Sequence, residues 1–154
     1  MARTIQRALL IVFIGAALGL AANAVSPKRI PYITPPKQEV PVSDFVSLDE
    51  AKKLWRSGSA FFLDARAPAD YQAGHIGNAF NLPAEEFETH YPQIASMLTP
   101  TTKIVVYCDG IECELSHELM KRLLAAGYKD IHILKNGWTE WRKAGLGVST
   151  GEQP

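Results

Sequence analysis

One stretch of the sequence, IVVYCDGIECELSHELMKRLLAAGY (residues 104–128), restricts the possible folds more than any other. Its apolar run ends at Cys108 without polar alternation, which is typical of a strand buried on both faces of a parallel sheet. Residues 115–126 then follow a helical pattern that Gly127 is expected to end. The side chains expected to face inward on this helix are Leu115, Leu119, Leu123 and Leu124. A buried strand followed closely by a helix predicts an α/β fold.

Similar alternation of strands and helices is found on both sides of this stretch. Residues 47–58 predict a helix that begins with the capping pair Ser47 and Glu50 and ends at Gly58. Further strands are expected at 60–65, 79–83 and 130–134, and further helices at 83–88, 94–98 and 137–145. Short connections between such elements predict one parallel sheet flanked by helices, with right-handed crossovers.

The first 25 residues differ in composition from the rest. Arg3 and Arg7 precede an apolar run, residues 8–25, in which Asn23 is the one polar residue. As a helix this run is about 27 Å long, close to the roughly 30 Å of a hydrocarbon core. It is expected to be a membrane anchor, or a signal peptide with Ala22-Asn23-Ala24 as its cleavage site. Either interpretation places the remaining chain on the non-cytosolic side, periplasmic or extracellular.

Residues 26–43 contain five of the ten prolines, which predicts an extended, semi-rigid linker. We therefore predict three parts: the hydrophobic segment 1–25, this linker, and one domain over residues 44–154. The formal net charge is zero. Nucleic acid, which is rich in phosphate, is therefore not expected as a partner.

Cys108 is expected at the carboxyl end of its strand, where open α/β sheets bind ligands. The next helix directs unpaired N–H groups at this loop and would stabilise a thiolate, the nucleophilic form of cysteine. We therefore expect an accessible Cys108 sulfur above the rim of the sheet, surrounded by inward-pointing amides. In the alternative, Cys108 is a small buried apolar side chain without chemistry.

Two longer motifs resemble one known family. FLDARAPADYQAGHIGNAFNLP (residues 62–83) is similar to the first signature of rhodanese-like domains, and YCDG with GYKDIHILKNGWTEWRKAGLGV is similar to the remainder. The match covers about residues 47–148, in the family's order. It implies the rhodanese-like α/β fold, with a parallel sheet flanked by helices and, in this chain, one hydrophobic helix before it.

The resemblance also implies sulfur transfer. In this family the catalytic cysteine, here Cys108, takes sulfane sulfur from a donor as a persulfide and passes it to a thiol acceptor. The backbone of the active-site loop would hold the persulfide through its N–H groups. That loop consists of Asp109, Gly110, Ile111, Glu112 and Cys113. The expected partners are the sulfur donor and acceptor, small molecules or proteins, and the membrane through residues 8–25. No metal or other cofactor is expected.

Three further residues match family positions that support the structure. Asp64 and Arg66 are expected to connect the first motif to the active-site loop, with a surface ion pair as the alternative. His75 is expected to be a hydrogen-bonded brace rather than a group that transfers protons. Trp138 and Trp141, three positions apart on a helix, are expected to face the core.

The loop departs from the family in its charge. Asp109, Glu112 and Glu114 lie close to Cys108, with no Lys or Arg before Lys121. Each nearby carboxylate is expected to raise the thiol pKa by about half a unit to one unit. The same charge repels thiosulfate, a dianion. A neutral or cationic donor, or a protein persulfide, is expected to fit better.

Cys113 is the second departure. It lies close enough along the chain to form a disulfide with Cys108, which an oxidising compartment favours. We therefore consider Cys113 a possible resolving thiol. Two other possibilities stay open: a catalytically silent rhodanese-like module that binds a partner protein at the membrane, and a soft-metal site. The ligands of that metal site would be Cys108, Cys113 and His117, with Glu112 or Glu114.

Overall fold

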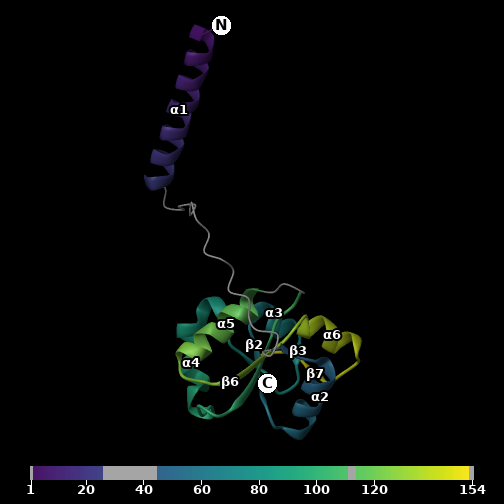
Figure 1. Cartoon of the computed structure of the whole chain (residues 1–154). Helices are drawn as coiled ribbons and strands as arrows, with labels where there is room; N and C mark the ends of the chain where they lie inside the picture. Colours follow the sequence, from purple (N-terminus) through teal and green to yellow (C-terminus); the bar gives the residue numbers. More distant parts are fainter. Residues whose placement is uncertain (1, 26–44, 111–113, 153–154) are drawn as a thin grey trace. The chain divides into compact units, whose positions relative to one another are not determined.

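Figure 1 shows a computed structural model that describes residues 2–25, 45–110 and 114–152. The chain divides into two compact units, Met1–Glu39 and Val40–Pro154. The described part of the first unit is a single helix, and the described part of the second is an α/β domain.

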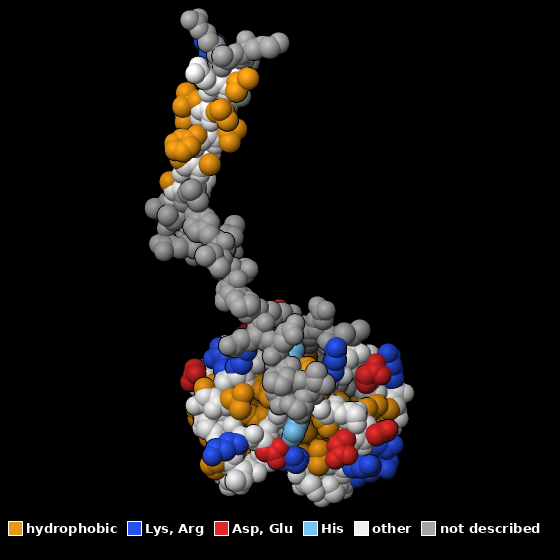
Figure 2. Space-filling model, in the orientation of Figure 1, with side chains coloured by type: hydrophobic (Ala, Val, Ile, Leu, Met, Phe, Trp, Pro, Cys, Tyr) orange, Lys and Arg blue, Asp and Glu red, His pale blue; other side chains and the backbone are white. Residues whose placement is uncertain are grey.

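Helix α1 (Ala2–Val25) consists mainly of apolar residues. Its described large apolar side chains, from Ile5 to Leu18, are exposed, as the orange atoms in Figure 2 show. Within the described residues it is the one helix long and apolar enough to cross a membrane, over Ile5–Asn23. A signal sequence meets the same criteria. The anchor and the cleaved signal therefore both stay predictions.

Five parallel strands form the sheet of the second unit, in the order β1-β6-β5-β2-β4. In that order the strands are Phe45–Val46, Asp130–Leu134, Lys103–Tyr107, Phe61–Asp64 and Phe80–Asn81. A separate antiparallel pair joins β3 (His75–Ile76) to β7 (Val148–Ser149). The predicted parallel α/β sheet flanked by helices is confirmed.

Helices cover both faces of the sheet (Figure 1). One face packs against the 3₁₀ turn η2 (Ala84–Glu86), α4 (Phe87–Ile94) and α5 (Glu114–Ala125). The other face packs against α2 (Leu48–Ser57) and α6 (Gly137–Lys143). Helix α3 (Pro68–Ala73) follows β2, and the 3₁₀ turn η3 (Ala95–Met97) follows α4. Alternate residues of the central strands point to opposite faces, and this alternation divides the core into two clusters.

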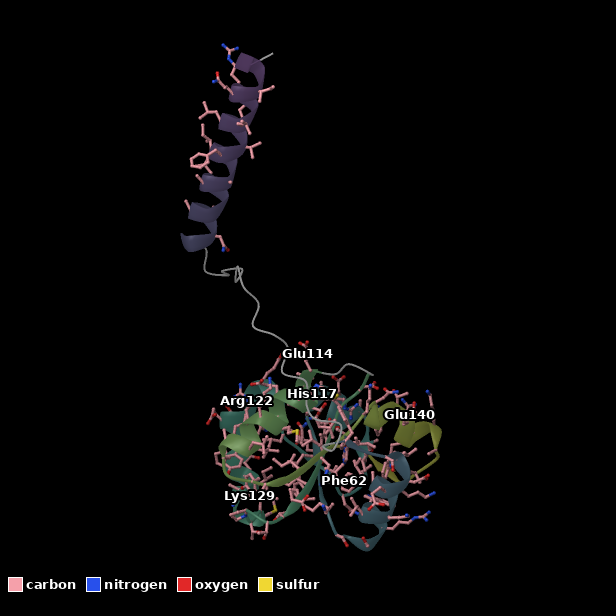
Figure 3. The ribbon with its side chains drawn as sticks, viewed as in Figure 1. Phe62, Glu114, His117, Arg122, Lys129 and Glu140 are labelled. Atoms are coloured by element: carbon pink, nitrogen blue, oxygen red, sulfur yellow. The ribbon has the colours of Figure 1, made fainter. Side chains whose placement is uncertain are left out.

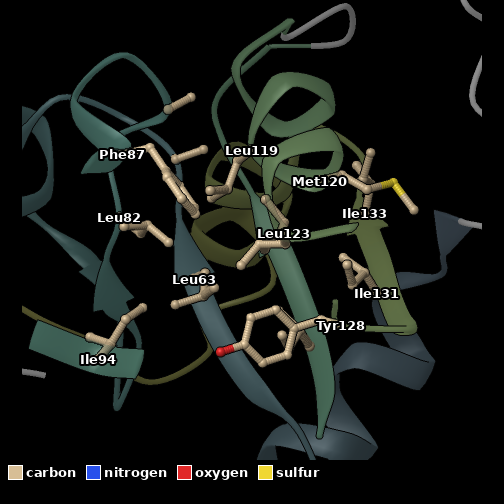
Figure 4. Close-up of a cluster of buried hydrophobic side chains, with 14 of the residues drawn as sticks. Leu63, Leu82, Phe87, Ile94, Leu119, Met120, Leu123, Tyr128, Ile131 and Ile133 are labelled. Atoms are coloured by element: carbon tan, nitrogen blue, oxygen red, sulfur yellow. The ribbon is translucent and has the colours of Figure 1, made fainter. Parts of the chain in front are cut away.

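The larger cluster is shown in Figure 4, where side chains from α4 and α5 meet those of the strands. Leu119 and Leu123 are fully buried there, as predicted. The prediction for Leu124 was wrong, because 48% of its surface is exposed. On a helix of 3.6 residues per turn, Leu124 lies about 100° from Leu123 and is carried out of the buried face.

Local capping chemistry explains where α2 begins and ends. The Ser47 side chain accepts a hydrogen bond from the Glu50 backbone N–H at 3.2 Å. Gly58 ends the helix in the left-handed region, with φ of 63°. Other boundaries differ from the predictions: the helix expected at 83–88 is a 3₁₀ turn followed by α4, which runs to Ile94 and contains Pro92. Residues 95–97 form 3₁₀ rather than α-helix.

Candidate active site at the carboxyl end of strand β5

Cys108 directly follows β5, which lies between β6 and β2 in the sheet. This is the predicted position, at the carboxyl end of a central strand. The side chain belongs to the larger core cluster, and the residue is 2% exposed. Its sulfur is part of a disulfide. The expectation of an accessible thiolate is therefore wrong for this oxidised state, since a disulfide sulfur neither ionises nor attacks a donor.

The predicted active-site loop is described in part. Ile111, Glu112 and Cys113 lie outside the described residues, so the cradle of loop amides and the resolving role of Cys113 stay predictions. Of the five loop residues, Asp109 and Gly110 are described, and both are exposed. Gly110 has φ of +90°, a conformation that favours glycine.

The described part of the loop is attached to the connection between β6 and α6. The Gly110 N–H donates to Asp109 Oδ1 and to Asn136 Oδ1, each at 3.0 Å. The Thr139 hydroxyl donates to Asp109 Oδ1. The Trp138 N–H donates to the Cys108 carbonyl oxygen at 3.1 Å. The Gly110 amide is therefore directed at two side chains and not, as predicted, at the sulfur.

Helix α5 provides a buried polar group beside the Cys108 sulfur. Ser116 is 3% exposed, and its Oγ lies 3.4 Å from Cys108 Sγ. His117, on the same helix, packs edge-on against Phe45, with the ring centroids 5.9 Å apart. Figure 3 shows Glu114 and His117 on the part of α5 near the loop. A buried hydroxyl beside the sulfur can donate a hydrogen bond to a thiolate once Cys108 is reduced.

Asp64 and Arg66 form a buried pair at the end of β2. Asp64 is fully buried and Arg66 is 6% exposed. Arg66 Nη2 lies 2.6 Å from Asp64 Oδ2, and it also donates to the Gly74 carbonyl oxygen at 2.7 Å. The alternative of a surface ion pair is therefore wrong. Burial lowers the pKa of Arg66, but the hydrogen bond and charge of Asp64, together with Tyr107 and Asp70, outweigh burial, so the pKa lies above its ordinary value.

This pair adjoins the strand that carries Cys108. Asp64 is paired in register with Tyr107, the residue before Cys108. The Tyr107 hydroxyl accepts a hydrogen bond from the Ile76 N–H at 3.0 Å. Burial, and then the Asp64 carboxylate, raise the pKa of Tyr107 above its ordinary value. Tyr107 is therefore neutral at physiological pH and contributes structure to the site.

His75 is fully buried and stacks on Tyr71, with ring centroids 3.7 Å apart. Its Nδ1 lies 2.9 Å from the Tyr71 carbonyl oxygen. Its Nε2 is buried without a hydrogen-bond partner among the described residues. These contacts agree with the prediction that His75 is a hydrogen-bonded brace. That His75 takes no part in proton transfer stays a prediction.

The two tryptophans of α6 differ in their surroundings. Trp141 is fully buried, whereas Trp138 is half-buried. The guanidinium carbons of Arg66 and Arg142 lie 4.7 and 5.5 Å from the centroid of the Trp138 ring. Trp138 is thus a contact surface for two cations.

Sequence reasoning missed several residues of this region: Ser116, Asn136, Thr139 and Arg142. Asn136 precedes Gly137 and has φ of +51°, and an Asn-Gly pair is a recognisable turn signal. Nothing in the local sequence connects Thr139 to Asp109, since 30 positions separate them.

Among the described residues, no group of three or more His, Cys, Asp or Glu side chains is arranged to hold a metal ion. The soft-metal alternative includes Glu112 and Cys113, which lie outside those residues. It therefore remains open.

Comparison with known proteins gives matches over this domain. A family model described as "Rhodanese-like domain" matches residues 47–144. The HTH-type transcriptional regulator Rv0324 of Mycobacterium tuberculosis is 32% identical over 108 residues, which cover 70% of this chain and 46% of the regulator. A tRNA uridine(34) hydroxylase of Erwinia tasmaniensis is 31% identical over 114 residues, 70% of this chain and 32% of the hydroxylase. The chain thus spans less than half the length of these curated relatives.

Solved structures agree with these matches. The Alr3790 protein of Anabaena sp. superimposes with a TM-score of 0.60 and 25% identity, over 69% of this chain and 92% of that chain. A thiosulfate sulfurtransferase of Pseudomonas aeruginosa superimposes with a TM-score of 0.57 and 26% identity, over 71% of this chain and 21% of that chain.

Proposed function

The chain belongs to the rhodanese-like domain family, and on this basis we propose that reduced Cys108 carries sulfane sulfur as a persulfide and passes it to a thiol acceptor. One observation carries the proposal. Cys108 follows a central parallel strand, in the region where α/β sheets bind ligands, and its sulfur lies 3.4 Å from the buried Ser116 hydroxyl. That hydroxyl can stabilise a negative charge on the sulfur in both halves of the reaction.

The reaction is two successive exchanges at sulfur. The Cys108 thiolate attacks the outer sulfur of a donor persulfide, a new S–S bond forms, and the donor's own S–S bond breaks to release the donor thiolate. An acceptor thiolate then attacks the outer sulfur of the Cys108 persulfide. The acceptor leaves as a persulfide and the Cys108 thiolate is regenerated. No net oxidation occurs, so no metal or redox cofactor is required.

Entry into this cycle from the oxidised state requires two electrons. A dithiol reductant attacks the disulfide, is itself oxidised to a disulfide, and releases the Cys108 thiol with the partner thiol. We propose Cys113 as that partner, because it is the only other cysteine in the chain. The proposed pair would protect Cys108 from irreversible oxidation on the non-cytosolic side of a membrane.

We further propose that α1 anchors the domain to a membrane, with the domain on the non-cytosolic side. The support is the apolar, exposed surface of α1 and the basic residues Arg3 and Arg7 before its apolar run. Protease treatment of intact cells or spheroplasts tests the orientation. Digestion of the domain without permeabilisation is expected, and full protection until permeabilisation would contradict it. A mature protein that begins near residue 25 would identify a cleaved signal instead.

A turnover assay tests the sulfur-transfer proposal. The full-length protein, reduced with a dithiol that is then removed, is mixed with a neutral alkyl persulfide donor and a thiol acceptor. Transfer is expected for the wild type and should be lost in Cys108→Ser. A matched Cys113→Ser variant should retain turnover but lose reversible inactivation by mild oxidants. Equal rates for wild type and Cys108→Ser would contradict the proposal.

A second candidate is a catalytically silent module that binds a partner protein. The burial of Cys108 and the engagement of the Gly110 amide by side chains favour it. This candidate predicts that reduced Cys108 fails to react with any persulfide donor. Its alkylation by a thiol-specific probe should then also require pH values above about 8.5, the ordinary cysteine pKa.

A further inference from the structure

A cleft of about 380 Å³ lies at one edge of the sheet, bordered by α3, β4 and α4. β4 is the last strand of the sheet, so it pairs with β2 on one side only. Phe80 and Asn81, the two residues of β4, both line the cleft. Its volume lies within the range of about 300–1,000 Å³ that is usual for ligand sites. Cys108 follows β5, two strands away in the sheet.

The main chain of Asn81 is available for pairing at this edge. In a parallel sheet, successive residues of a strand direct their N–H and C=O groups to opposite sides. The Leu82 N–H donates to the Asp64 carbonyl oxygen at 2.9 Å, so the backbone groups of Asn81 face away from β2. Among the residues that the structure describes, no turn, loop or side-chain hydrogen bond occupies either group. One N–H and one C=O of the same residue are what an added strand pairs with.

This edge is held in a fixed conformation. Asn81 Nδ2 donates to the carbonyl oxygens of Asp64 and Arg66, at 3.1 and 3.0 Å, which attaches its side chain to the end of β2. The half-buried Phe80 stacks on Phe61, with ring centroids 4.7 Å apart. Residues that are already ordered lose little conformational entropy when a ligand binds. Phe80 also offers the cleft an apolar surface.

The charges at the cleft are complementary to a cationic occupant. Glu152 lines the cleft and is exposed, and its carboxylate has a weak contact with Gln72 Nε2 at 3.5 Å. His90, on the α4 side, lies 3.3 Å from the Glu86 carboxylate. Asp70 on α3 is exposed as well. No Lys or Arg is found among the described residues that line the cleft, so a Lys or Arg of a ligand meets carboxylates without a competing cation.

We propose that this cleft binds an extended, basic peptide segment of a partner protein, which adds a strand to β4. The peptide main chain pairs with the N–H and C=O of Asn81, an apolar side chain contacts Phe80, and a Lys or Arg reaches Glu152. The occupant is a single extended chain rather than the edge of a second domain, because α3 and α4 border the cleft and would meet the helices of that domain. The interaction does not depend on sulfur transfer at Cys108.

A synthetic peptide with alternating basic and apolar residues tests the site. Ac-KVKVK-NH₂ is titrated against the full-length ¹⁵N-labelled protein in a neutral detergent, while the Asn81 backbone amide is followed. A saturable shift of this resonance is expected, with slower hydrogen exchange of the same amide, because the N–H gains an acceptor. Ac-EVEVE-NH₂ should bind at least about tenfold more weakly, since its charges repel Glu152. No saturable binding, or binding that leaves the Asn81 amide unchanged, would overturn the proposal.

A charge reversal tests the role of Glu152. In Glu152→Lys, the dissociation constant for Ac-KVKVK-NH₂ is expected to rise about three- to tenfold, because an exposed attraction becomes a repulsion. Glu50→Lys, on α2 at the other face of the sheet, has the same net charge and should keep the wild-type value. An equal rise in both variants would mean that general charge attraction explains binding, and the site would be rejected.

The same measurements distinguish a second copy of the chain from a peptide. Protection of the Asn81 amide that grows with protein concentration, in the absence of peptide, would identify a second copy as the occupant and refute the proposal. Saturable peptide binding by a protein that transfers no sulfur would refute the sulfur-transfer proposal and support the peptide site.

Discussion

Asp64 is fully buried, and its carboxylate forms an ion pair with Arg66. In the sheet, Asp64 on β2 is paired with Tyr107 on β5. A buried charge is stable only beside its oppositely charged partner, because neither bulk solvent nor counterions compensate it. The Arg66 guanidinium, which also binds the Gly74 carbonyl and contacts Trp138, depends on Asp64 in the same way. This ion pair therefore connects β2, the turn after α3, and α6.

Replacement of this carboxylate is expected to destabilise the fold strongly. Asp64→Asn leaves the Arg66 cation buried without its counter-charge and should lower the free energy of unfolding by about 3–5 kcal/mol. Urea denaturation measures the loss. Asp49→Asn, an exposed substitution of the same type, is the control and should cost less than about 1 kcal/mol. Comparable losses in the two variants would mean that the buried pair contributes no special stability.

A second single-residue test concerns Ser116. Its Oγ lies 3.4 Å from Cys108 Sγ, and its hydroxyl can donate to the thiolate of the reduced protein. Ser116→Ala is expected to raise the pH midpoint of Cys108 alkylation by about one unit, since a hydrogen bond to a charged group contributes roughly 1.5–3 kcal/mol. Ser96→Ala, exposed on η3, is the control. An unchanged midpoint would exclude a role of Ser116 in thiolate stabilisation.

Among the secondary-structure elements, α6 connects the sheet to the active-site loop. Its first residue, Gly137, packs so closely that an added Cβ would lie 2.7 Å from the Tyr107 Cβ and 3.1 Å from Leu134 Cγ. The next two residues hold the loop through the Cys108 carbonyl and Asp109. The position of α6 relative to β5 therefore determines how the described part of the loop is attached.

A methyl group at Gly137 is expected to disturb this element. Gly137→Ala should lower the free energy of unfolding by about 1–3 kcal/mol, because α6 must move away from Tyr107. Thermal denaturation followed by circular dichroism measures the change. Lys135→Ala, exposed and two residues earlier, should be close to neutral. Wild-type stability in Gly137→Ala would contradict the close packing of α6 on β5.

For the molecule as a whole, the sequence predicted the fold better than the site. The apolar runs of β2, β5 and β6 are long enough to be recognised, whereas β1, β3 and β7 have two residues each and carry no periodic signal. Cys108 was placed correctly at the end of its strand. The burial of Cys108 entered the predictions only as the alternative, because it depends on packing against α5 and the neighbouring strands, which the local sequence does not show.

Acid stability is expected to depend on a cluster of charged residues at the amino end of the central strands. Lys103 Nζ lies 2.8 Å from Asp130 Oδ1, and His132 Nε2 lies 2.7 Å from the same oxygen. The hydrogen bond from Lys103, more than the one from His132, lowers the pKa of Asp130. Because the folded pKa lies below the unfolded value of about 3.9, Asp130 stabilises the fold above that value and loses this effect as the pH falls.

Urea denaturation between about pH 6 and pH 3 tests this dependence. The wild type should lose more stability over this range than Asp130→Asn, because the variant has no carboxylate to protonate. Glu85→Gln, exposed on η2, is the control and should follow the wild type. Parallel pH profiles for wild type and Asp130→Asn would contradict the contribution of Asp130.

Mass spectrometry of the reduced protein after exposure to a neutral persulfide donor tests the sulfur-transfer proposal most directly. The peptide containing Cys108 is expected to gain the mass of one sulfur atom, and a thiol acceptor should remove it again. A Cys108 peptide of unchanged mass with every donor, in protein whose disulfide is fully reduced, would contradict the proposed persulfide chemistry.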